Sequence, residues 1–167
     1  MEKGGCYLNL IIRRIKAEEL NEALKLVLDT FLKFETPDYG EEGTETFKRD
    51  IIENPEFIKN CITGRNRIWG AFYDEKIVGI IGMRGESHIS LLFTHSDYHR
   101  RGIATKIFNT LLEDVKEENP TITEITLNSS PYGLHFYHKI GFIDTDVQKV
   151  TNGIIYTPMV YKIKETE

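Results

Sequence analysis

Residues 88–115 combine three patterns that constrain the fold more than any other stretch of the chain. Residues 89–93 form a short apolar run, which suits a buried strand better than a helix. The chain then passes through a polar loop, residues 94–102. Apolar residues at helical spacing follow from residue 103 to residue 115. The stretch therefore predicts a strand, a tight loop and a helix in immediate succession.

The loop has the chemistry of an anion site. Backbone N–H groups are unpaired at a helix N-terminus, and the helix dipole favours negative charge there. Gly102 lets a ligand approach the main chain because it has no Cβ atom, and Arg100 and Arg101 add positive charge. We expect the loop to bind a phosphate or pyrophosphate. The alternative is a helix that merely needs a tight entry turn.

The composition is that of one ordinary globular domain, which we assign to residues 1–167. The net charge of −5 and the absence of a basic stripe argue against nucleic acid as a partner and favour a cationic acceptor such as an amine. No apolar run approaches membrane-spanning length, so we expect no membrane partner. Cys6 and Cys61 are predicted to be free thiols, and the chain is predicted to be cytoplasmic.

The rest of the chain predicts alternating strands and helices. Before the central stretch we expect a strand at 8–15, a helix at 17–31, a loop at 34–43, a second helix at 44–52 and a hairpin of strands 68–73 and 77–83. After it we expect a strand at 122–127, a helix with Ser130 as N-cap and Pro131 as its first residue, a turn at Asn152-Gly153 and a last strand at 159–163. One helix separates strand 89–93 from strand 122–127, so the two should run parallel.

An acidic cluster lies in and after the loop at 34–43. Its members are Glu35, Asp38, Glu41, Glu42 and Glu45. The simpler interpretation is a solvated acidic turn, because charge clusters usually face water. The alternative is a lip that attracts a cationic amine, with Phe34 and Tyr39 as its apolar wall.

Two motifs resemble those of the GNAT superfamily of N-acyltransferases. His99-Arg100-Arg101-Gly102-Ile103-Ala104 is similar to the acyl-CoA signature Gln/Arg-x-x-Gly-x-Gly/Ala, with His99 as a departure in the first position. Phe136-Tyr137-His138-Lys139-Ile140-Gly141-Phe142 closely matches the second motif, Phe-Tyr-x-Lys-x-Gly-Phe. Ser130 stands where that motif often has Asn.

The resemblance implies an α+β fold, a mixed and mostly antiparallel sheet with a central splayed parallel strand pair flanked by helices. It implies acetyl-CoA as cosubstrate and direct transfer of the acetyl group to a primary amine. The positions that would contact the coenzyme are Leu92, Phe93, Thr94, His99, Arg100, Arg101, Gly102, Ile103, Ala104, Thr105, Ser130 and Tyr137. Tyr137 falls on the tyrosine that protonates the departing thiolate; the alternative is a core tyrosine that packs against Phe142.

His88 is the candidate general base, because several members of the family have a catalytic glutamate at the equivalent offset and an imidazole can accept a proton at neutral pH. Glu86 and Ser90 are lesser candidates, and an ordinary strand-end histidine is the alternative for His88. His135 and His138 have no third ligand at metal-binding spacing, so we expect no metal. A non-catalytic acyl-CoA-binding or regulatory module is the competing function. The sequence leaves open the amine acceptor, the acyl preference and whether the protein is a monomer or a homodimer.

Overall fold

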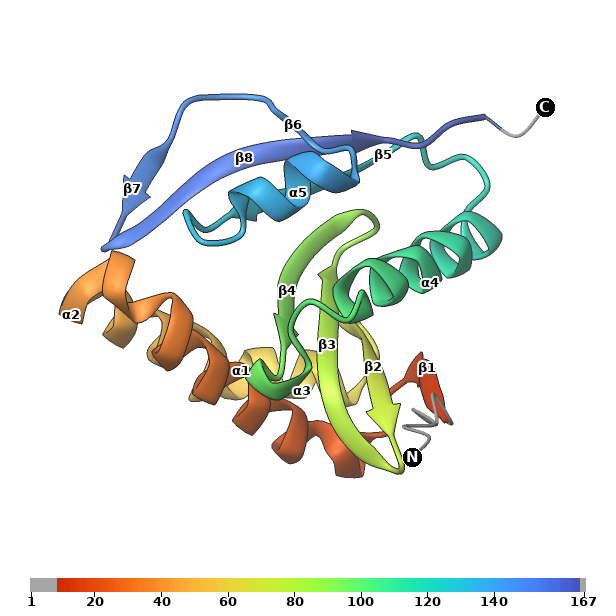
Figure 1. Ribbon diagram of the computed structural model, residues 1–167, viewed down its shortest axis with the longest axis horizontal. Helices are drawn as coiled ribbons and strands as arrows, with labels where there is room; N and C mark the ends of the chain where they lie inside the picture. The colour runs from red at the N-terminus through yellow and green to blue at the C-terminus, as the bar shows by residue number, and fades with distance from the viewer. Residues whose placement is uncertain (1–8, 166–167) are drawn as a thin grey trace, which may run out of the picture.

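A computed structural model describes residues 9–165 (Figure 1). The strands are β1 (Leu10–Arg14), β2 (Arg67–Tyr73), β3 (Lys76–Arg84), β4 (His88–Thr94), β5 (Glu124–Ser129), β6 (Ile143–Asp144), β7 (Lys149–Thr151) and β8 (Ile154–Lys162). The helices are α1 (Leu20–Phe34), α2 (Thr36–Phe47), α3 (Pro55–Ile62), α4 (Ile103–Glu118) and α5 (Leu134–Ile140). Short 3₁₀ turns precede α1 and follow β4, and a short π-helix at Lys48–Ile52 extends α2.

The strands form one mixed sheet in the order β1-β2-β3-β4-β5-β8-β6, with β7 paired to β8. All pairs are antiparallel except β4–β5. That parallel pair is confined to His88 opposite Thr126 and Ile89 opposite Leu127, after which the strands diverge. Figure 1 shows the resulting V, with β4 on one arm and β5, β8 and α5 on the other. The predicted fold class and its splayed parallel pair are confirmed.

A bulge explains where the V opens. Gly82 of β3 faces Leu91 and its neighbour Met83 faces Ile89, which leaves Ser90 as an extra residue in β4. A bulge bends its strand and increases the local twist. Ser90 directly follows the last residue of β4 that pairs with β5, so the bend turns β4 away from β5 at that point.

Helices cover both faces of the sheet because its strands alternate. Ile80 packs with Val27 and Phe31 of α1, whereas the next residue, Ile81, packs with Leu111 of α4. Successive side chains of a strand point to opposite faces, so each face receives its own apolar layer. All five of these side chains are almost completely buried. The two layers hold α1 and α4 against the strands that open into the V.

The segment from 34 to 62 differs from the sequence-based prediction. The expected loop at 34–43 is largely helical, because α2 starts at Thr36 and continues to Phe47 with a kink at Gly40, where φ is +67°. The prediction also missed α3. Pro37 and Pro55 each lie in the first turn of a helix, where the missing N–H of proline costs nothing. The loop expected at 34–43 included Pro37, which instead lies at the start of α2.

The start of α5 is a second correction. The helix begins at Leu134 with Gly133 as its N-cap, so Ser130 does not cap it and Pro131 is not its first residue. The Ser130 hydroxyl instead accepts a hydrogen bond from the Gly133 N–H at 3.1 Å. This bond closes a separate turn ahead of the helix, and the turn leaves the Ser130 side chain beside the V.

The last strand is longer than predicted, because β8 continues from Ile154 to Lys162 through Pro158. The carbonyl of Pro158 points to the outer edge of β8, where it accepts a hydrogen bond from the Thr145 N–H at 2.9 Å. The backbone nitrogen of Pro158, which carries no hydrogen, faces the same edge of β8, between the residues of β8 that pair with β6 and those that pair with β7. Proline is tolerated at an edge position of this kind. The turn expected at Asn152-Gly153 is confirmed, with positive φ at both residues.

Candidate functional site

The edge of β4 that faces the V carries unpaired main-chain groups. Residues 91–94 of β4 pair with β3 on one side. On the other side, among residues 9–165, the ladder between β4 and β5 ends at Ile89, so residues 91–94 have no partner in β5. An unpaired backbone group costs free energy unless water or a ligand satisfies it. In an antiparallel strand the main-chain groups of every second residue point to the same edge. Because the His95 N–H donates to the Val78 carbonyl in β3, the main-chain groups of Phe93 also face β3, so the expected backbone contact from Phe93 is not available in the V. Leu92 and Thr94 are the residues whose main-chain groups face an extended molecule lying in the V.

The loop after β4 forms an anion cradle at the start of α4. Arg100 and Gly102 both have left-handed backbone conformations, with φ of +63° and +74°. Gly102 is the N-cap of α4, and no side chain in the described part of the chain caps the helix. The first-turn N–H groups of Ile103, Ala104 and Thr105 are therefore free for a ligand. Alternating left-handed residues and a helix N-terminus make a site for phosphate oxygens.

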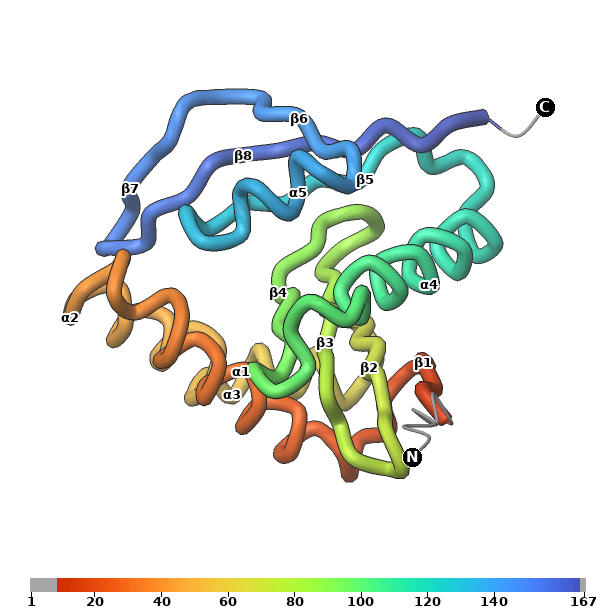
Figure 2. Tube along the Cα trace, viewed as in Figure 1, coloured from red at the N-terminus to blue at the C-terminus, as the bar shows by residue number. Residues whose placement is uncertain are grey.

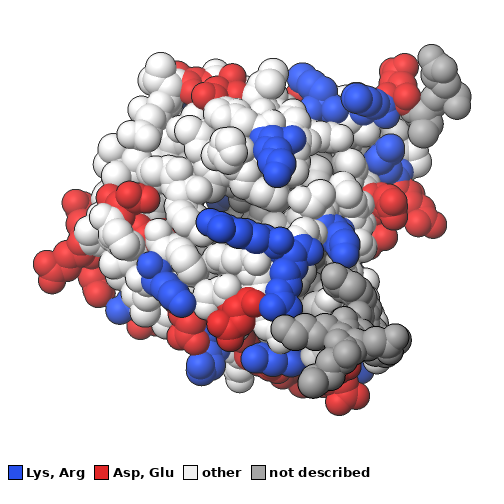
Figure 3. Space-filling model, viewed as in Figure 1, with Lys and Arg blue, Asp and Glu red and all other residues white. Residues whose placement is uncertain are grey.

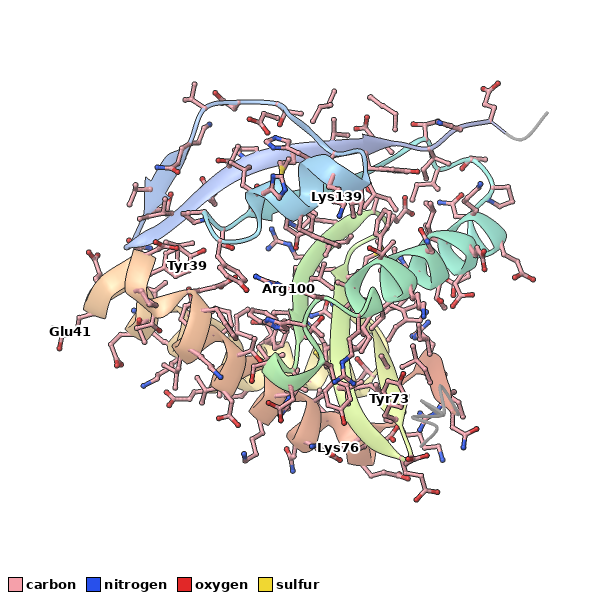
Figure 4. All side chains as sticks on the ribbon, viewed as in Figure 1. Tyr39, Glu41, Tyr73, Lys76, Arg100 and Lys139 are labelled. Carbon is pink, nitrogen blue, oxygen red and sulfur yellow. The ribbon has the colours of Figure 1, made fainter. Side chains whose placement is uncertain are left out.

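The three basic side chains of this loop have different surroundings. His99 is held internally, because its Nε2 lies 2.7 Å from the carbonyl oxygen of Thr94. The guanidinium of Arg101 lies over the ring of Tyr98, 5.2 Å from the ring centroid. Arg100 is exposed and lies near the centre of the face seen in Figure 4. The same face is hollowed in Figure 3, with Lys and Arg side chains along the lower edge of the hollow.

Tyr137 lies on the opposite arm of the V, on α5. Its ring packs edge-to-face against Phe142, with 5.6 Å between the centroids. A Cβ atom at Gly133 would lie only 3.0 Å from the Tyr137 ring, so the turn ahead of α5 packs closely on it. Burial raises the pKa of the Tyr137 phenol, and the nearby charge of Glu35 raises it further. The phenol is therefore protonated at physiological pH and is a hydrogen-bond donor.

Glu35 joins this site, although the sequence offered it only as one member of an acidic cluster. It occupies the junction between α1 and α2, where it is half-buried. The pKa of the Glu35 carboxyl is raised to about 7, mainly by burial. A hydrogen bond with the Ser130 side chain lowers this pKa, and the charge of Asp38 raises it. Tyr39 is close enough that burial and the charge of Glu35 raise the pKa of its phenol. No local signal could have placed Glu35 beside Tyr137, which is about a hundred residues away in the chain.

An aromatic contact ties the end of α1 to both arms of the V. The ring of Phe34 lies 4.7 Å from the ring of His99 in the loop after β4. It also lies 5.2 Å from the ring of Tyr132 in the turn ahead of α5. Phe34 therefore spans the two loops that end the V, and it brings Glu35 to the Tyr137 side of the opening.

The sequence from residue 35 to residue 163 matches the acetyltransferase (GNAT) domain, which is most of the chain. The chain belongs to the GNAT acetyltransferase family. The match includes both motifs, and with them the open edge of β4 and the cradle at α4. No protein with a curated description matches the sequence significantly.

Solved structures support the same fold for this acetyltransferase. A GCN5-related N-acetyltransferase from Rhodopseudomonas palustris is 19% identical, with a TM-score of 0.80 over 93% of this chain and 97% of that one. The PaiA N-acetyltransferase from Thermoplasma acidophilum, solved with coenzyme A, is 20% identical, with a TM-score of 0.76 over 93% of this chain and all of that one. An aminoglycoside 6'-N-acetyltransferase, also complexed with coenzyme A, is 15% identical, with a TM-score of 0.65 over 95% of this chain and all of that one.

The base expected at His88 remains an untested prediction, and its surroundings do not favour it. His88 belongs to the closed end of the V, where it still pairs with Thr126. Its Nδ1 lies 2.9 Å from the Thr126 hydroxyl. Burial, together with the charge of Arg84, lowers the pKa of His88 to about 4. Such an imidazole is neutral at pH 7 but binds a proton weakly.

Other reactive groups lie apart from the V in the part of the acetyltransferase that the structure describes. Cys61 is a half-buried free thiol on α3, and burial raises its pKa to about 11, which makes it a poor nucleophile. His138 pairs with Asp144 at 2.6 Å. Among residues 9–165 no three His, Cys, Asp or Glu side chains are grouped to hold a metal ion. None of the described helices is long and apolar enough to span a bilayer.

Proposed function

We propose that this acetyltransferase transfers the acetyl group of acetyl-CoA to a primary amine by direct attack. One observation carries the proposal: an open main-chain edge, an anion cradle and a protonated tyrosine converge on one V-shaped opening. Acetyl-CoA is the acetyl donor, as the family implies. The PaiA and aminoglycoside enzymes, both solved with coenzyme A, are N-acetyltransferases, which supports an amine as the acceptor here.

The chain's own groups would hold the donor along the V. The main-chain N–H groups from Arg100 to Thr105 would bind the pyrophosphate, and the positive charge of Arg100 would add to that attraction. The main-chain groups of Leu92 and Thr94 would bind the extended arm in place of a β5 strand. A β4 N–H aimed at the acetyl oxygen would stabilise the negative charge that develops there. His99 would shape the cradle from behind through its contact with Thr94.

Tyr137 would donate its phenolic proton to the sulfur as the carbon–sulfur bond breaks. Its raised pKa keeps the phenol protonated, so a proton is available as negative charge develops on the sulfur. Ser130 belongs to the same cluster, since its side chain hydrogen-bonds to Glu35. With Cys61 remote from the V, no described cysteine is available for an acyl-enzyme intermediate, which supports direct transfer.

A steady-state assay tests the proposal: coenzyme A release is measured with acetyl-CoA and a panel of primary amines. At least one amine should give saturable turnover, and Tyr137→Phe should lower kcat by about 10²-fold, because general-acid catalysis typically contributes this much or more. Tyr161→Phe is the matched control, because Tyr161 packs against Phe142 from another side and should retain wild-type kcat.

The alternatives give different results. A binding or regulatory module would be stabilised thermally by acetyl-CoA but would acetylate no amine. A protein that is neither stabilised by millimolar coenzyme A nor active would contradict both functions. An unchanged kcat in Tyr137→Phe, with chemistry rate-limiting, would remove the acid role from Tyr137 and leave the transfer itself intact.

A further inference from the structure

Glu35 is fixed by the backbone at the junction of two helices. Its N–H donates to the carbonyl of Phe31 in α1 at 2.9 Å, and its own carbonyl accepts from the N–H groups of Asp38 and Tyr39 in α2 at 2.9 and 3.2 Å. Phe34, the preceding residue, is held between His99 and Tyr132. The main chain of Glu35 is therefore anchored on both sides at the opening of the V.

The groups around the Glu35 carboxyl come from three segments. Asp38 and Tyr39 belong to α2, Ser130 to the turn after β5, and Tyr137 to α5. Ser130 provides a hydrogen bond, and the remaining groups are acidic or phenolic. Among residues 9–165, the ion pairs of Lys, Arg and His side chains are all made with other carboxylates. Glu35 is thus a half-buried carboxyl with no cation in contact, beside the proposed acid.

We propose that Glu35 is the general base that deprotonates the acceptor ammonium, and that the acceptor reaches the thioester from the α1–α2 side of the V. This inference rests on the proposed function and adds to it the second proton-transfer group and the side of entry. A carboxylate without a protein cation is also the group that would attract a cationic amine into the site.

The proton balance of the reaction needs both groups. The Glu35 carboxylate takes one proton from the ammonium, which frees the nitrogen lone pair to form the carbon–nitrogen bond. As the carbon–sulfur bond breaks, the sulfur takes the phenolic proton of Tyr137. The nitrogen of the new amide gives up its second proton, which returns Tyr137 to the phenol. Glu35 then releases its proton to solvent, so one ammonium and one thioester give one amide, one thiol and one proton.

The electrostatics of the two groups suit these roles. Burial brings the pKa of Glu35 to about 7, near the pH of the cell, where a base both holds the correct charge and binds a proton well. The pKa of Tyr137 is raised far above that value, so the two groups differ as a base and an acid must. His88, with a pKa near 4, is the weaker base. Glu41 is exposed on α2 and lies away from Arg100 in Figure 4.

The test compares Glu35→Gln with wild type across pH, using the amine of the panel that wild type acetylates fastest. We expect kcat/KM at pH 7 to fall by about 10²–10⁴-fold, the usual contribution of a general base. The wild-type rate should rise with pH and level off above about 7, because the Glu35 carboxyl must lose its proton. In Glu35→Gln the levelling-off near pH 7 should disappear, because the rate would follow the fraction of unprotonated amine and keep rising with pH. Glu35→Asp should restore part of the rate. The affinity for acetyl-CoA, measured by calorimetry, should not change.

A second substrate separates base catalysis from a structural role. A fluorinated counterpart of the same amine is largely deprotonated at pH 7 and needs no base, so Glu35→Gln should acetylate it nearly as fast as wild type. The matched control is Glu22→Gln, an exposed glutamate on α1, which should behave as wild type with both amines.

Two results would overturn the inference and leave the proposed function standing. The first is a Glu35→Gln enzyme that keeps the wild-type pH dependence near pH 7. The second is an equal loss of rate with the basic and the fluorinated amine, which would make Glu35 a structural residue. A wild-type protein that binds acetyl-CoA but acetylates no amine at any pH would instead refute the proposed function, and the base role with it.

Discussion

The two sides of the V are built by different means. The proposed donor side, residues 88–118, is one continuous stretch in which β4 leads directly into the cradle and α4. The proposed acceptor side is assembled from α1, α2 and the turn between β7 and β8, which are far apart in the chain. Figure 2 shows that turn lying against α2. The donor side presents mainly backbone groups, and the acceptor side presents side chains. A chain built in this way can retain one cosubstrate while its acceptor changes.

The contact between α2 and the β7–β8 turn is unusually close. A Cβ atom on Gly43 would collide with the backbone carbonyl of Gly153. The Thr46 hydroxyl donates a hydrogen bond to the carbonyl of Asn152 at 2.7 Å. Since Thr46 is almost completely buried, this bond satisfies a polar group that would otherwise be costly. The contact holds α2, and with it Tyr39, at the acceptor side of the V.

The largest expected effect tests the donor side alone. Gly102→Glu should weaken acetyl-CoA binding by about 10²-fold or more, because like charges brought together cost several kcal/mol and each 1.4 kcal/mol is tenfold in affinity. The glutamate would place its negative charge at the N-cap of α4, where the pyrophosphate is expected. Isothermal calorimetry with acetyl-CoA measures the loss.

Gly64→Glu is the matched control for that variant. Gly64 has φ of +79° against +74° for Gly102, and a Cβ atom would meet nothing within 4 Å at either position. The two variants therefore carry the same backbone strain and the same new charge, but Gly64 lies in the turn after α3. If both variants bound acetyl-CoA as wild type does, the cradle would not hold the pyrophosphate, and the division into a donor and an acceptor side would fail.

Local sequence carries most of the information about the donor side. The apolar run before Thr94, the glycine at position 102 and the helical stripe that includes Ile107 each specify backbone conformation within a few residues. The contact residues expected there include main-chain groups, whose chemistry is the same for every residue type. The opening of the V itself depends on the bulge at Ser90, which the sequence pattern does not mark.

The acceptor side was harder to predict for physical reasons. The glycines and the proline between Phe34 and Thr44 indicate a loop, but tertiary packing favours a kinked helix, with Phe47 stacked on Phe31 at 3.8 Å between centroids. Tertiary contacts routinely override weak local propensities. The role of Glu35 depends on Ser130 and Tyr137, which are separated from it by about a hundred residues. Such a cluster becomes visible only when the fold brings the elements together.

The contact between α2 and the β7–β8 turn gives an intermediate effect on the acceptor side. Gly43→Ala should lower the free energy of unfolding by about 1–3 kcal/mol, because the added methyl group must displace backbone rather than a flexible side chain. The KM for the amine should rise while the affinity for acetyl-CoA is unchanged. Denaturant unfolding and steady-state kinetics measure the two quantities.

Gly40→Ala controls for loss of a glycine from the same helix. Gly40 has open space around it, but its φ of +67° and ψ of −164° are essentially restricted to glycine, so its substitution should cost about 1–3 kcal/mol of backbone strain with no change in amine KM. If Gly43→Ala weakened acetyl-CoA binding and amine binding equally, the two sides would not be independent, and the comparison drawn above would need revision.

The smallest expected effect concerns stability rather than activity, and it sharpens the assignment of Glu35 to the acceptor side. The folded-state pKa of Glu35, about 7, lies above that of an unfolded glutamate, so the folded chain holds the proton more tightly. Loss of that proton as pH rises from about 4 to about 7 therefore costs stability, and the cost is complete above pH 7. Glu35→Gln should match wild type at pH 4 and exceed it at pH 8, by on the order of 1 kcal/mol after allowance for partial solvent access. Urea unfolding across this pH range measures the difference in unfolding free energy between Glu35→Gln and wild type. The exposed Glu22→Gln variant is the control and should show no such trend. A difference that stays constant at every pH would mean that the Glu35 carboxyl titrates like one in water.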